Sequence, residues 1–296
     1  MIVKDNRLAY SAWLAVCFFW GTGYLAIRIG VVDFPPMLFS GLRILGAGII
    51  LTAIMILRRH SLPHGKDWLH LAIVGIMLEG VSNSILAWSA QWIPSGLMGL
   101  LVAMTPFWMV GIEALTGGEK LTLKTVFGLL IGFCGLFLLV FPQLQDVSFD
   151  PKFLAGCLLI QVVCISYGAG SVYAKRKPVQ VSPLMGAGIQ MLVAGGVITI
   201  VGTFWGEFGS LHFNLRPLIA LIYMLIFGSL VGYSSYIYSL QKLPISIVSL
   251  HRYINPVVAV FLGWLILNEK FTWLDAIAVA MIFTGVVFVQ VNRKAL

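Results

Sequence analysis

The chain has 296 residues, of which 59% are hydrophobic and 10% are charged, and its mean hydropathy is +0.97. This composition leaves too little polar surface to cover a water-soluble globule, which excludes an ordinary cytosolic enzyme. The formal net charge is +8, but the basic residues lie in short connections between apolar stretches, which argues against nucleic-acid binding.

Ten segments are long and apolar enough to cross a hydrocarbon core about 30 Å thick, because roughly 20 helical residues span that distance. They are predicted at 8–29, 36–57, 68–91, 95–116, 123–141, 153–174, 183–204, 217–240, 245–267 and 272–291. The sequence therefore predicts an all-α integral membrane protein with ten transmembrane helices.

The first span carries Trp20 and Tyr24, which lie one helical turn apart and share a face. Aromatic walls suit flat or cationic ligands, so both are candidate substrate-binding residues. Tyr167 in the sixth span is a candidate for the same reason. Packing, or anchoring at the membrane interface, is the alternative for all three.

Charged residues in spans two and three are the strongest functional candidates, because an ionisable group at mid-bilayer costs about 2.5–3.5 kcal/mol. Glu79 lies near the middle of its span, and Asn83 follows one turn later on the same face. Glu79 is expected to bind a cationic group or a proton. Arg43 could grip a substrate carboxylate with its guanidinium fork. A structural ion pair between an arginine and Glu79 is the alternative.

The ninth span combines a histidine, an arginine and an Asn-Pro pair. His251 and Asn255 are spaced i, i+4 and share a face, and His251 is a candidate proton relay, although a structural hydrogen bond is the alternative. Arg252 and Asn255 are candidate substrate-binding residues. Pro256 lacks an amide donor and predicts a helix break there, as Pro106 does in the fourth span.

Other motifs carry no chemistry on inspection. His60 and His64 have i, i+4 spacing but are interrupted by Pro63, and no metal site is expected. No phosphate-binding loop or nucleophile motif is complete, so no cofactor is expected and the chain is predicted not to be an enzyme. In the fifth span, Gly128 and Gly132 form a Gly-x-x-x-Gly stripe that indicates close helix packing or a homodimer face.

Lys and Arg are distributed unequally between the two sides of the predicted membrane. Thirteen would be cytoplasmic if the N-terminus is cytoplasmic: Lys4, Arg7, Arg58, Arg59, Lys66, Lys120, Lys124, Lys175, Arg176, Lys177, Lys242, Arg293 and Lys294. The outer connections would hold three: Lys152, Arg216 and Lys270. Because basic residues stay preferentially on the cytoplasmic side, both termini are predicted to be cytoplasmic.

The two halves of the chain resemble one another. A shift of 147 pairs Trp20 with Tyr167, Arg28 with Lys175, Pro36 with Pro183 and Ala47-Gly48 with Ala194-Gly195, and a later shift of 150 pairs Pro94 with Pro244, Pro106 with Pro256 and Glu119-Lys120 with Glu269-Lys270. Nine of 32 positions are identical between 91–122 and 241–272. Arg252 has no basic counterpart, since Val102 matches it. Residues 1–147 and 148–296 are therefore predicted to be two five-helix repeats, and an odd number of spans inverts the second.

Further short motifs extend over essentially the whole chain. They are Trp20-Gly21-Thr22, Pro35-Pro36 with Gly41-Leu42-Arg43, Pro94-Ser95-Gly96, Gly170-Ser171-Val172-Tyr173, and Asn255-Pro256-Val257-Val258-Ala259-Val260 with Asn268-Glu269-Lys270. The chain thus resembles the ten-helix EamA-type drug/metabolite transporters, particularly the inner-membrane exporters of pigments, amino acids and related metabolites. Several relatives have aromatic or small residues where this chain has His251-Arg252, so the resemblance carries over no substrate.

The resemblance implies ten helices around a central cavity and secondary transport, commonly efflux. We therefore expect a multi-pass protein of the inner, cytoplasmic membrane that exports a small organic solute, amino-acid-like, pigment or drug-like, by alternating access. Coupling to protons through Glu79 or His251 is left open. The alternatives are an intramembrane enzyme acting on a lipid, for which no nucleophile and base are recognisable, and a passive channel.

Overall fold

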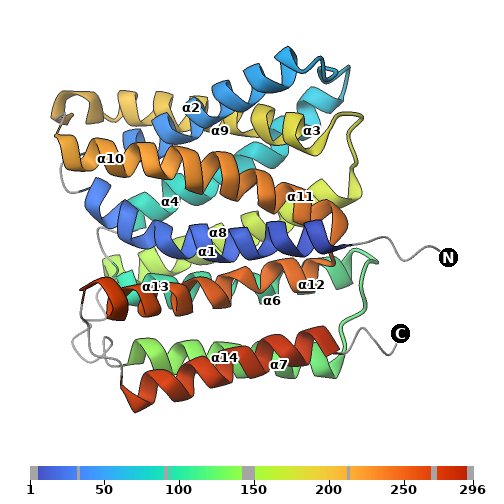
Figure 1. Ribbon diagram of the computed structural model, residues 1–296, viewed down its shortest axis with the longest axis vertical. Coiled ribbons are helices and arrows are strands. Elements are labelled where there is room, and N and C mark those ends of the chain that lie inside the picture. Colours follow the sequence, from blue (N-terminus) through green and yellow to red (C-terminus); the bar gives the residue numbers. More distant parts are fainter. Residues whose placement is uncertain are drawn as a thin grey trace.

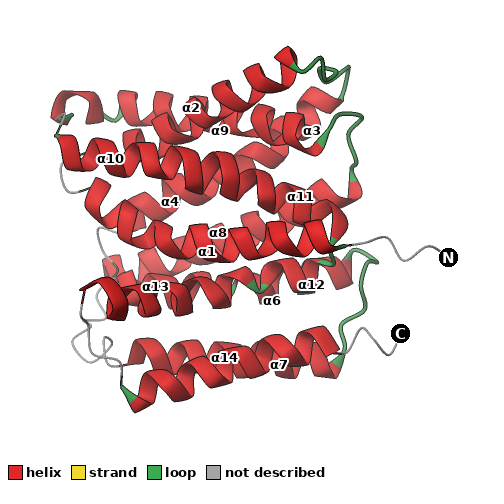
Figure 2. Cartoon of the chain, in the orientation of Figure 1, coloured by secondary structure: helices red, strands yellow, loops and turns green. Residues whose placement is uncertain are grey.

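A computed structural model describes residues 6–31, 34–89, 93, 95–141, 151–211, 214–267 and 272–291. In these residues the chain forms helices joined by connections, with no strand (Figure 2). Eight helical stretches of the described residues are long and apolar enough to cross a membrane. The 24-residue helix α1 (Arg7–Gly30) and the 19-residue helix α14 (Trp273–Val291) run alongside them (Figure 1).

Besides α1 and α14, the described residues form further helical segments, and four of the membrane-length stretches consist of more than one of these segments. The remaining elements are α2 (Pro36–Leu57), α3 (Asp67–Gly75), η1 (Ile76–Gly80), α4 (Val81–Ser89), α5 (Ser95–Val102), α6 (Thr105–Leu115), α7 (Leu123–Val140), α8 (Pro151–Arg176), α9 (Pro183–Phe204), η3 (Glu207–Ser210), α10 (Leu215–Tyr223), η4 (Met224–Tyr233), α11 (Ser234–Lys242), α12 (Ile245–Ser249) and α13 (His251–Leu267). The segments η1 and η4 are π-helical and join α3 to α4 and α10 to α11 without a break. π-helical turns widen a helix locally and occur frequently at functional sites.

The helices lie side by side, and α1 begins at the end of the bundle where α14 finishes (Figure 1). We call this the terminus end; it also holds the α2–α3, α6–α7 and α8–α9 connections. The opposite end, called the far end, holds η3 and the start of α2. Contacts at each end agree with this arrangement: Asp67 accepts from Gln180 N (3.0 Å) at the terminus end, and Thr22 contacts Tyr223 at the far end.

Helices α2 and α9 cross closely because glycines line the contact. Four approaches matter: Gly41 to Thr199, Gly188 to Thr52, Gly48 to Leu192, and Gly195 to Leu45. A Cβ atom added to Gly195 would lie 2.3 Å from Leu45 N, and one added to Gly48 would lie 2.5 Å from Leu192 N. Small residues of this kind let two membrane helices pack backbone against backbone.

Helices α7 and α14 pack in the same manner at one edge of the bundle (Figure 1). A Cβ atom on Gly128 would lie 2.8 Å from Gly285 O, and one on Gly135 would lie 2.7 Å from Ala278 O. Gly132 faces Tyr253 of α13. The Gly-x-x-x-Gly stripe is therefore used for packing inside the chain, which was one of its two predicted roles.

The structure corrects the predicted helix break at Pro256. Helix α13 continues through Pro256, and the interruption lies at Leu250, between α12 and α13. Proline removes one hydrogen bond, to the carbonyl of Arg252, while the turn before it keeps its own bond, from Ile254 N to Leu250 O at 3.2 Å. By contrast, Pro106 stands in the first turn of α6, directly after the turn residues 103–104.

Glu113, near the end of α6, makes an ion pair with α8. Its side chain is buried, and its carboxylate lies 3.4 Å from Arg176 Nη2, a residue at the end of α8. Arg176 also donates to the carbonyls of Glu113 and Thr116, so it caps the end of α6. Pro94 and the Asn268-Glu269-Lys270 turn, both used in the predicted repeat, lie outside the described residues.

Candidate functional site

Glu79 lies inside the π-helical segment η1 and is 7% exposed, deep within the bundle. Asn83, in the first turn of α4, donates from Nδ2 to Glu79 Oε2 at 3.1 Å and to Glu79 O at 2.9 Å. The two predicted residues are therefore in contact on one face. The amide shields part of the carboxylate and leaves its remaining acceptor capacity open to other donors.

Arg43 of α2, which is 6% exposed, reaches the same group from a second helix. Its Nη2 donates to Asn83 Oδ1 at 2.8 Å, and its Nη1 donates to Ser229 Oγ, in η4, at 3.0 Å. Among the described residues, no ion pair within 4.0 Å joins Arg43 to Glu79 directly. Asn83 thus bridges the charges of Glu79 and Arg43. Hydrogen bonds from Arg43 to Asn83 and Ser229 connect α2 with α4 and η4.

A neutral counterpart of this group lies in the second half of the chain. Tyr233 of η4 donates to Gln190 Oε1, of α9, at 2.9 Å. Under the repeat shifts, Gln190 corresponds to Arg43, Tyr233 to Asn83, and Ser229 to Glu79. Sequence reasoning missed Gln190, Ser229 and Tyr233 as site residues, yet the repeat register alone could have found them.

Trp20, Tyr167 and Tyr236 form an aromatic cluster beside the charged group. The ring of Tyr236 stacks on Trp20 with centroids 5.5 Å apart and lies 5.4 Å from Tyr167. The guanidinium carbon of Arg252 lies 4.4 Å from the Tyr167 ring centroid and 5.9 Å from that of Trp20. Such distances fit cation–π contacts, so Arg252 occupies the aromatic faces. Tyr236 was not predicted.

His251 is completely buried against this cluster. Its ring lies edge-on to Trp20 (centroids 5.1 Å apart) and to Tyr236 (5.5 Å). Its Nδ1 is 2.7 Å from Val248 O, which fixes the ring, while Nε2 is buried without a hydrogen-bond partner in the described residues. The hydrogen bond to Val248 thus uses one ring nitrogen, and the other is enclosed within the bundle.

Asn255 faces the first helix. With its amide oriented to suit its neighbours, Nδ2 donates to His251 O at 2.8 Å and to Cys17 O at 3.1 Å. A Cβ atom on Gly21 would lie 2.6 Å from Val258 Cβ, so α1 and α13 approach closely here. Asn255 thus joins two helices beside the cluster. The side chain of Tyr24 lies outside the described residues.

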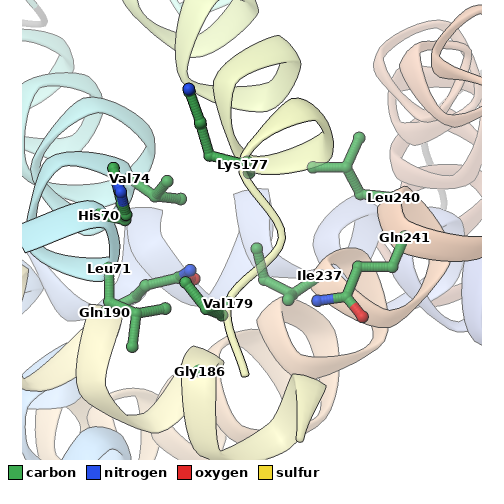
Figure 3. Close-up of a pocket in the computed structure, with 11 residues that line it drawn as sticks. His70, Leu71, Val74, Lys177, Val179, Gly186, Gln190, Ile237, Leu240 and Gln241 are labelled. Carbon is green, nitrogen blue, oxygen red and sulfur yellow. The ribbon is translucent and has the colours of Figure 1, made fainter. Parts of the chain in front are cut away.

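A small cavity opens between α3, α8, α9 and α11 at the terminus end (Figure 3). It holds about 20 Å³, enough for one water-sized molecule, and His70, Lys177, Gln190 and Gln241 supply its polar lining. We call the charged group, its neutral counterpart and the aromatic cluster with Arg252 the polar centre; Gln190, which accepts from Tyr233, belongs both to this centre and to the cavity lining. In the described residues, no cluster of three His, Cys, Asp or Glu side chains could hold a metal ion.

The far end is closed by contacts between the two halves of the chain. Thr22 Oγ1 lies 2.6 Å from the Tyr223 hydroxyl, and the rings of Phe19 and Phe227 stack with centroids 5.1 Å apart. Glu207 of η3 accepts from the first turn of α2, with Oε2 2.8 Å from Leu38 N. These contacts separate the polar centre from the far end.

Comparison with known proteins fits this architecture. The chain is 33% identical over 285 residues to the uncharacterized inner membrane transporter YedA of Escherichia coli K12, covering 96% of this chain and 91% of that protein. It is 28% identical to the protein PecM of Dickeya dadantii, covering 96% and 92%. A crystal structure with 19% sequence identity superposes with a TM-score of 0.82 over 99% of this chain and 100% of its own, which establishes a shared fold.

Two separate parts of the chain, residues 7–141 and 154–291, match one family, and together they make up most of its length. YedA is an inner membrane transporter by name, and YoaV of Bacillus subtilis, which is 27% identical over 88% of this chain and 88% of its own length, is a transporter by name. The protein is therefore a multi-pass membrane protein that belongs to the EamA-like transporter family.

Proposed function

We propose that this chain is a ten-span secondary transporter that exports a small organic solute by alternating access through the polar centre around Glu79. Two inverted five-helix halves, 1–147 and 148–296, would exchange conformations so that the centre faces each side in turn. The observation that carries the proposal is the reciprocal pattern of contacts between the halves, described next.

The α2–α9 contacts come in pairs that exchange the two halves. Gly41 contacts Thr199, while Gly188 and Thr52, their partners under the shift of 147, contact each other. The Gly48–Leu192 and Gly195–Leu45 contacts form a second such pair. A surface that pairs with its own copy in this way requires a two-fold axis. These pairs support a two-fold relation between the halves, with the axis passing between α2 and α9.

The α7–α14 packing repeats the pattern at the shift of 150. Gly128 approaches Gly285 O, and the equivalent positions, Ala278 and Gly135, approach each other. The axis thus passes between α7 and α14 as well. Because α2 and α9 run in opposite directions across the bundle (Figure 1), such an axis would lie in the membrane plane. This geometry supports inverted rather than parallel repeats.

The polar centre would be the substrate site. The hydrogen-bonded pairs around it follow the two-fold relation, with Arg43 and Asn83 on one side and Gln190 and Tyr233 on the other. The charges do not follow it, because the second pair is neutral. Trp20, Tyr167 and Arg252 would contact the solute, and Glu79 or His251 would carry a coupled proton. The cavity at the terminus end and the closure at the far end support a state that faces the terminus end.

The distribution of basic residues supports a cytoplasmic terminus end. Arg58, Arg59, Lys66 and Lys177 lie there, whereas Arg216 lies at the far end. With the cavity on the cytoplasmic side, a solute would enter from the cytoplasm and leave at the far end. This direction is export.

The conformational part of the proposal can be tested before any substrate is identified. Spin labels at K66C and Q241C, one in each half, report the terminus end, and labels at I27C and R216C report the far end, in a chain whose four native cysteines are replaced by alanine. We expect the first distance to grow as the second shrinks across lipid and pH conditions. Both pairs separating together would indicate a channel, and two invariant distances would contradict alternating access.

Transport itself requires a solute, which a thermal-shift screen of amino acids, polyamines, pigments and cationic drugs would supply. Flux of any solute that stabilises the protein is then measured in proteoliposomes with and without an imposed pH gradient. Coupling through Glu79 predicts that the gradient drives flux in the native chain and not in E79Q. Flux indifferent to the gradient in both proteins would remove proton coupling and leave transport standing.

A further inference from the structure

We infer that the polar centre binds a small organic anion, a carboxylate carried on a flat or apolar body. This inference rests on the proposed transport site and names the class of solute that it accepts. The evidence is the balance of charge at the centre, the occupation of the aromatic faces by Arg252, and a buried guanidinium N–H that has no acceptor.

The centre holds more positive than negative charge. Glu79 lies within electrostatic reach of both Arg43 and Arg252, so two guanidinium groups face one carboxylate. The other acidic side chains of the described residues lie near the ends of the bundle, where each has a local partner: Asp67 with Gln180, Glu113 with Arg176, Glu119 with Lys175, Glu207 with Leu38, and Asp275 with Thr272. Within the described residues, the centre thus carries one excess positive charge, which an anion would balance.

The aromatic cluster taken alone would suggest a cationic ligand, because ring faces attract cations. In this structure Arg252 already lies over the faces of Tyr167 and Trp20. An arriving cation would compete with that guanidinium and meet its repulsion at short range, in a setting where water screens little. A flat anion meets neither obstacle, since its carboxylate can pair with Arg252 while the guanidinium stays over the rings.

Arg43 supplies the second observation. Its two terminal nitrogens donate to Ser229 and Asn83, but its Nε is buried and has no hydrogen-bond partner in the described residues. A buried N–H without an acceptor is costly, so such donors usually meet a ligand or a water. The free donor on a side chain that is 94% buried points to an acceptor that enters the centre. A carboxylate oxygen provides that acceptor.

Three probes with one ring and different charges test this inference on the full chain in detergent. Sodium benzoate, benzylamine hydrochloride and benzyl alcohol carry a negative, a positive and no charge, respectively, at neutral pH. We expect benzoate to raise the midpoint of thermal unfolding by about 2–5 °C at ten times its Kd, and the other two to leave it unchanged or lower it.

Variants of one arginine assign the effect to the centre. R252Q should lose at least half of the benzoate shift, and R252K, which keeps the positive charge, should retain most of it. The matched control is R216Q, an exposed arginine at the far end, where the shift should be unaltered. If R252Q fails to fold, R43K serves instead, because lysine keeps the charge but has no Nε–H donor.

Several outcomes would overturn the inference: a larger shift with benzylamine than with benzoate, an equal benzoate shift in R252Q, or an equal shift with sodium chloride at the same concentration. These results are separable from the proposed transport. Spin-label distances that never alternate while benzoate still binds would defeat transport and leave the anion site. Spin-label distances that alternate, together with a larger thermal shift for benzylamine than for benzoate, would defeat the anion site and leave the proposed transport standing.

Discussion

At the scale of single residues, Arg43 is the side chain on which the polar centre depends most. It joins α2 to α4 through Asn83 and to η4 through Ser229. We predict that R43M destabilises the protein by about 3 kcal/mol, because it leaves both partners without a donor and removes one member of a buried charge group. Unfolding of the micelle-bound protein by sodium dodecyl sulfate, followed by circular dichroism, measures the change.

The control lies on the same helix. Arg58 is exposed at the end of α2, and R58M should change stability by less than about 0.5 kcal/mol. In the double variant R43M/E79Q the loss should be smaller than the sum of the single losses, since both substitutions remove the same interaction between the two charges through Asn83. Additive losses would mean that Arg43 and Glu79 are not coupled through Asn83.

The sequence predicts this site well where neighbours in one helix meet. Glu79 and Asn83 could be paired because they are four residues apart, and the structure brings them into contact. Ser229 and Tyr236 could not be found from local spacing, because they reach the site from the other half of the chain. Only tertiary packing, or a systematic use of the repeat register, brings such residues together.

At the scale of helices, the crossing of α2 and α9 offers two adjacent glycines in different environments. A Cβ atom on Gly195 would lie 2.3 Å from Leu45 N, whereas one on Gly196 would have nothing within 4 Å. We predict that G195A destabilises the fold by about 1–3 kcal/mol through overpacking. G196A should be neutral, or stabilising by up to about 1 kcal/mol, since alanine favours helix more than glycine does. The same unfolding titration measures both.

The difference in stability between G195A and G196A shows whether α2 and α9 pack tightly at Gly195. Equal effects of the two substitutions would mean that α2 and α9 do not touch at Gly195. The reciprocal position in the other half is Gly48, whose added Cβ would lie 2.5 Å from Leu192 N. A two-fold arrangement predicts a loss in G48A of similar size to that in G195A.

Pro256 gives a second test at this scale. Because α13 continues through it, P256A restores a backbone donor to the carbonyl of Arg252 and should stabilise the protein by about 1–3 kcal/mol. If the weakened helix serves the conformational exchange, the same variant should slow flux in proteoliposomes. P106A is the matched control, and it should change stability by less than about 0.5 kcal/mol, because proline suits the first turn of α6.

Helix existence and position were predictable from hydropathy, and break positions were not. The third span was predicted at 68–91, and the structure has helix from Asp67 to Ser89. Hydropathy fixes such bounds because the bilayer sets the length of a span. The break at Leu250 carries no proline and no glycine, and the π-helical turns η1 and η4 leave no compositional signal, so packing decides their places.

At the scale of the whole molecule, the positions of the two ends relative to the membrane can be measured with two serines. Ser61 is exposed at the terminus end and Ser210 is exposed at the far end. We predict that a membrane-impermeant maleimide labels S210C in spheroplasts and labels S61C only after lysis, because the excess of basic residues favours a cytoplasmic location of the terminus end. The native chain, whose four thiols are free, controls for background labelling. The opposite pattern would invert the topology and turn the proposed export into import.

In the proposed export cycle the far end opens for a solute to leave, and one capping contact joins the two halves of the chain there. Glu207, in the connection between α9 and α10, accepts from the backbone of Leu38 and so caps α2. Loss of such a cap costs about 0.5–2 kcal/mol. In an alternating-access cycle this energy favours the closed far end, so E207A should raise the population with separated spin labels at I27C and R216C by about 2- to 30-fold.

Asp275 provides the matched control, because it caps α14 from within the same helix by accepting from Thr272 N at 2.7 Å. D275A removes a comparable cap but breaks no link between the halves. It should therefore lower stability by a similar amount and leave the spin-label distances unchanged. Equal changes in the spin-label distances of D275A and E207A would mean that E207A acts only through a general loss of stability. A shift confined to E207A would mean that the two halves move as separate bodies and that the capped start of α2 resists their separation at the far end.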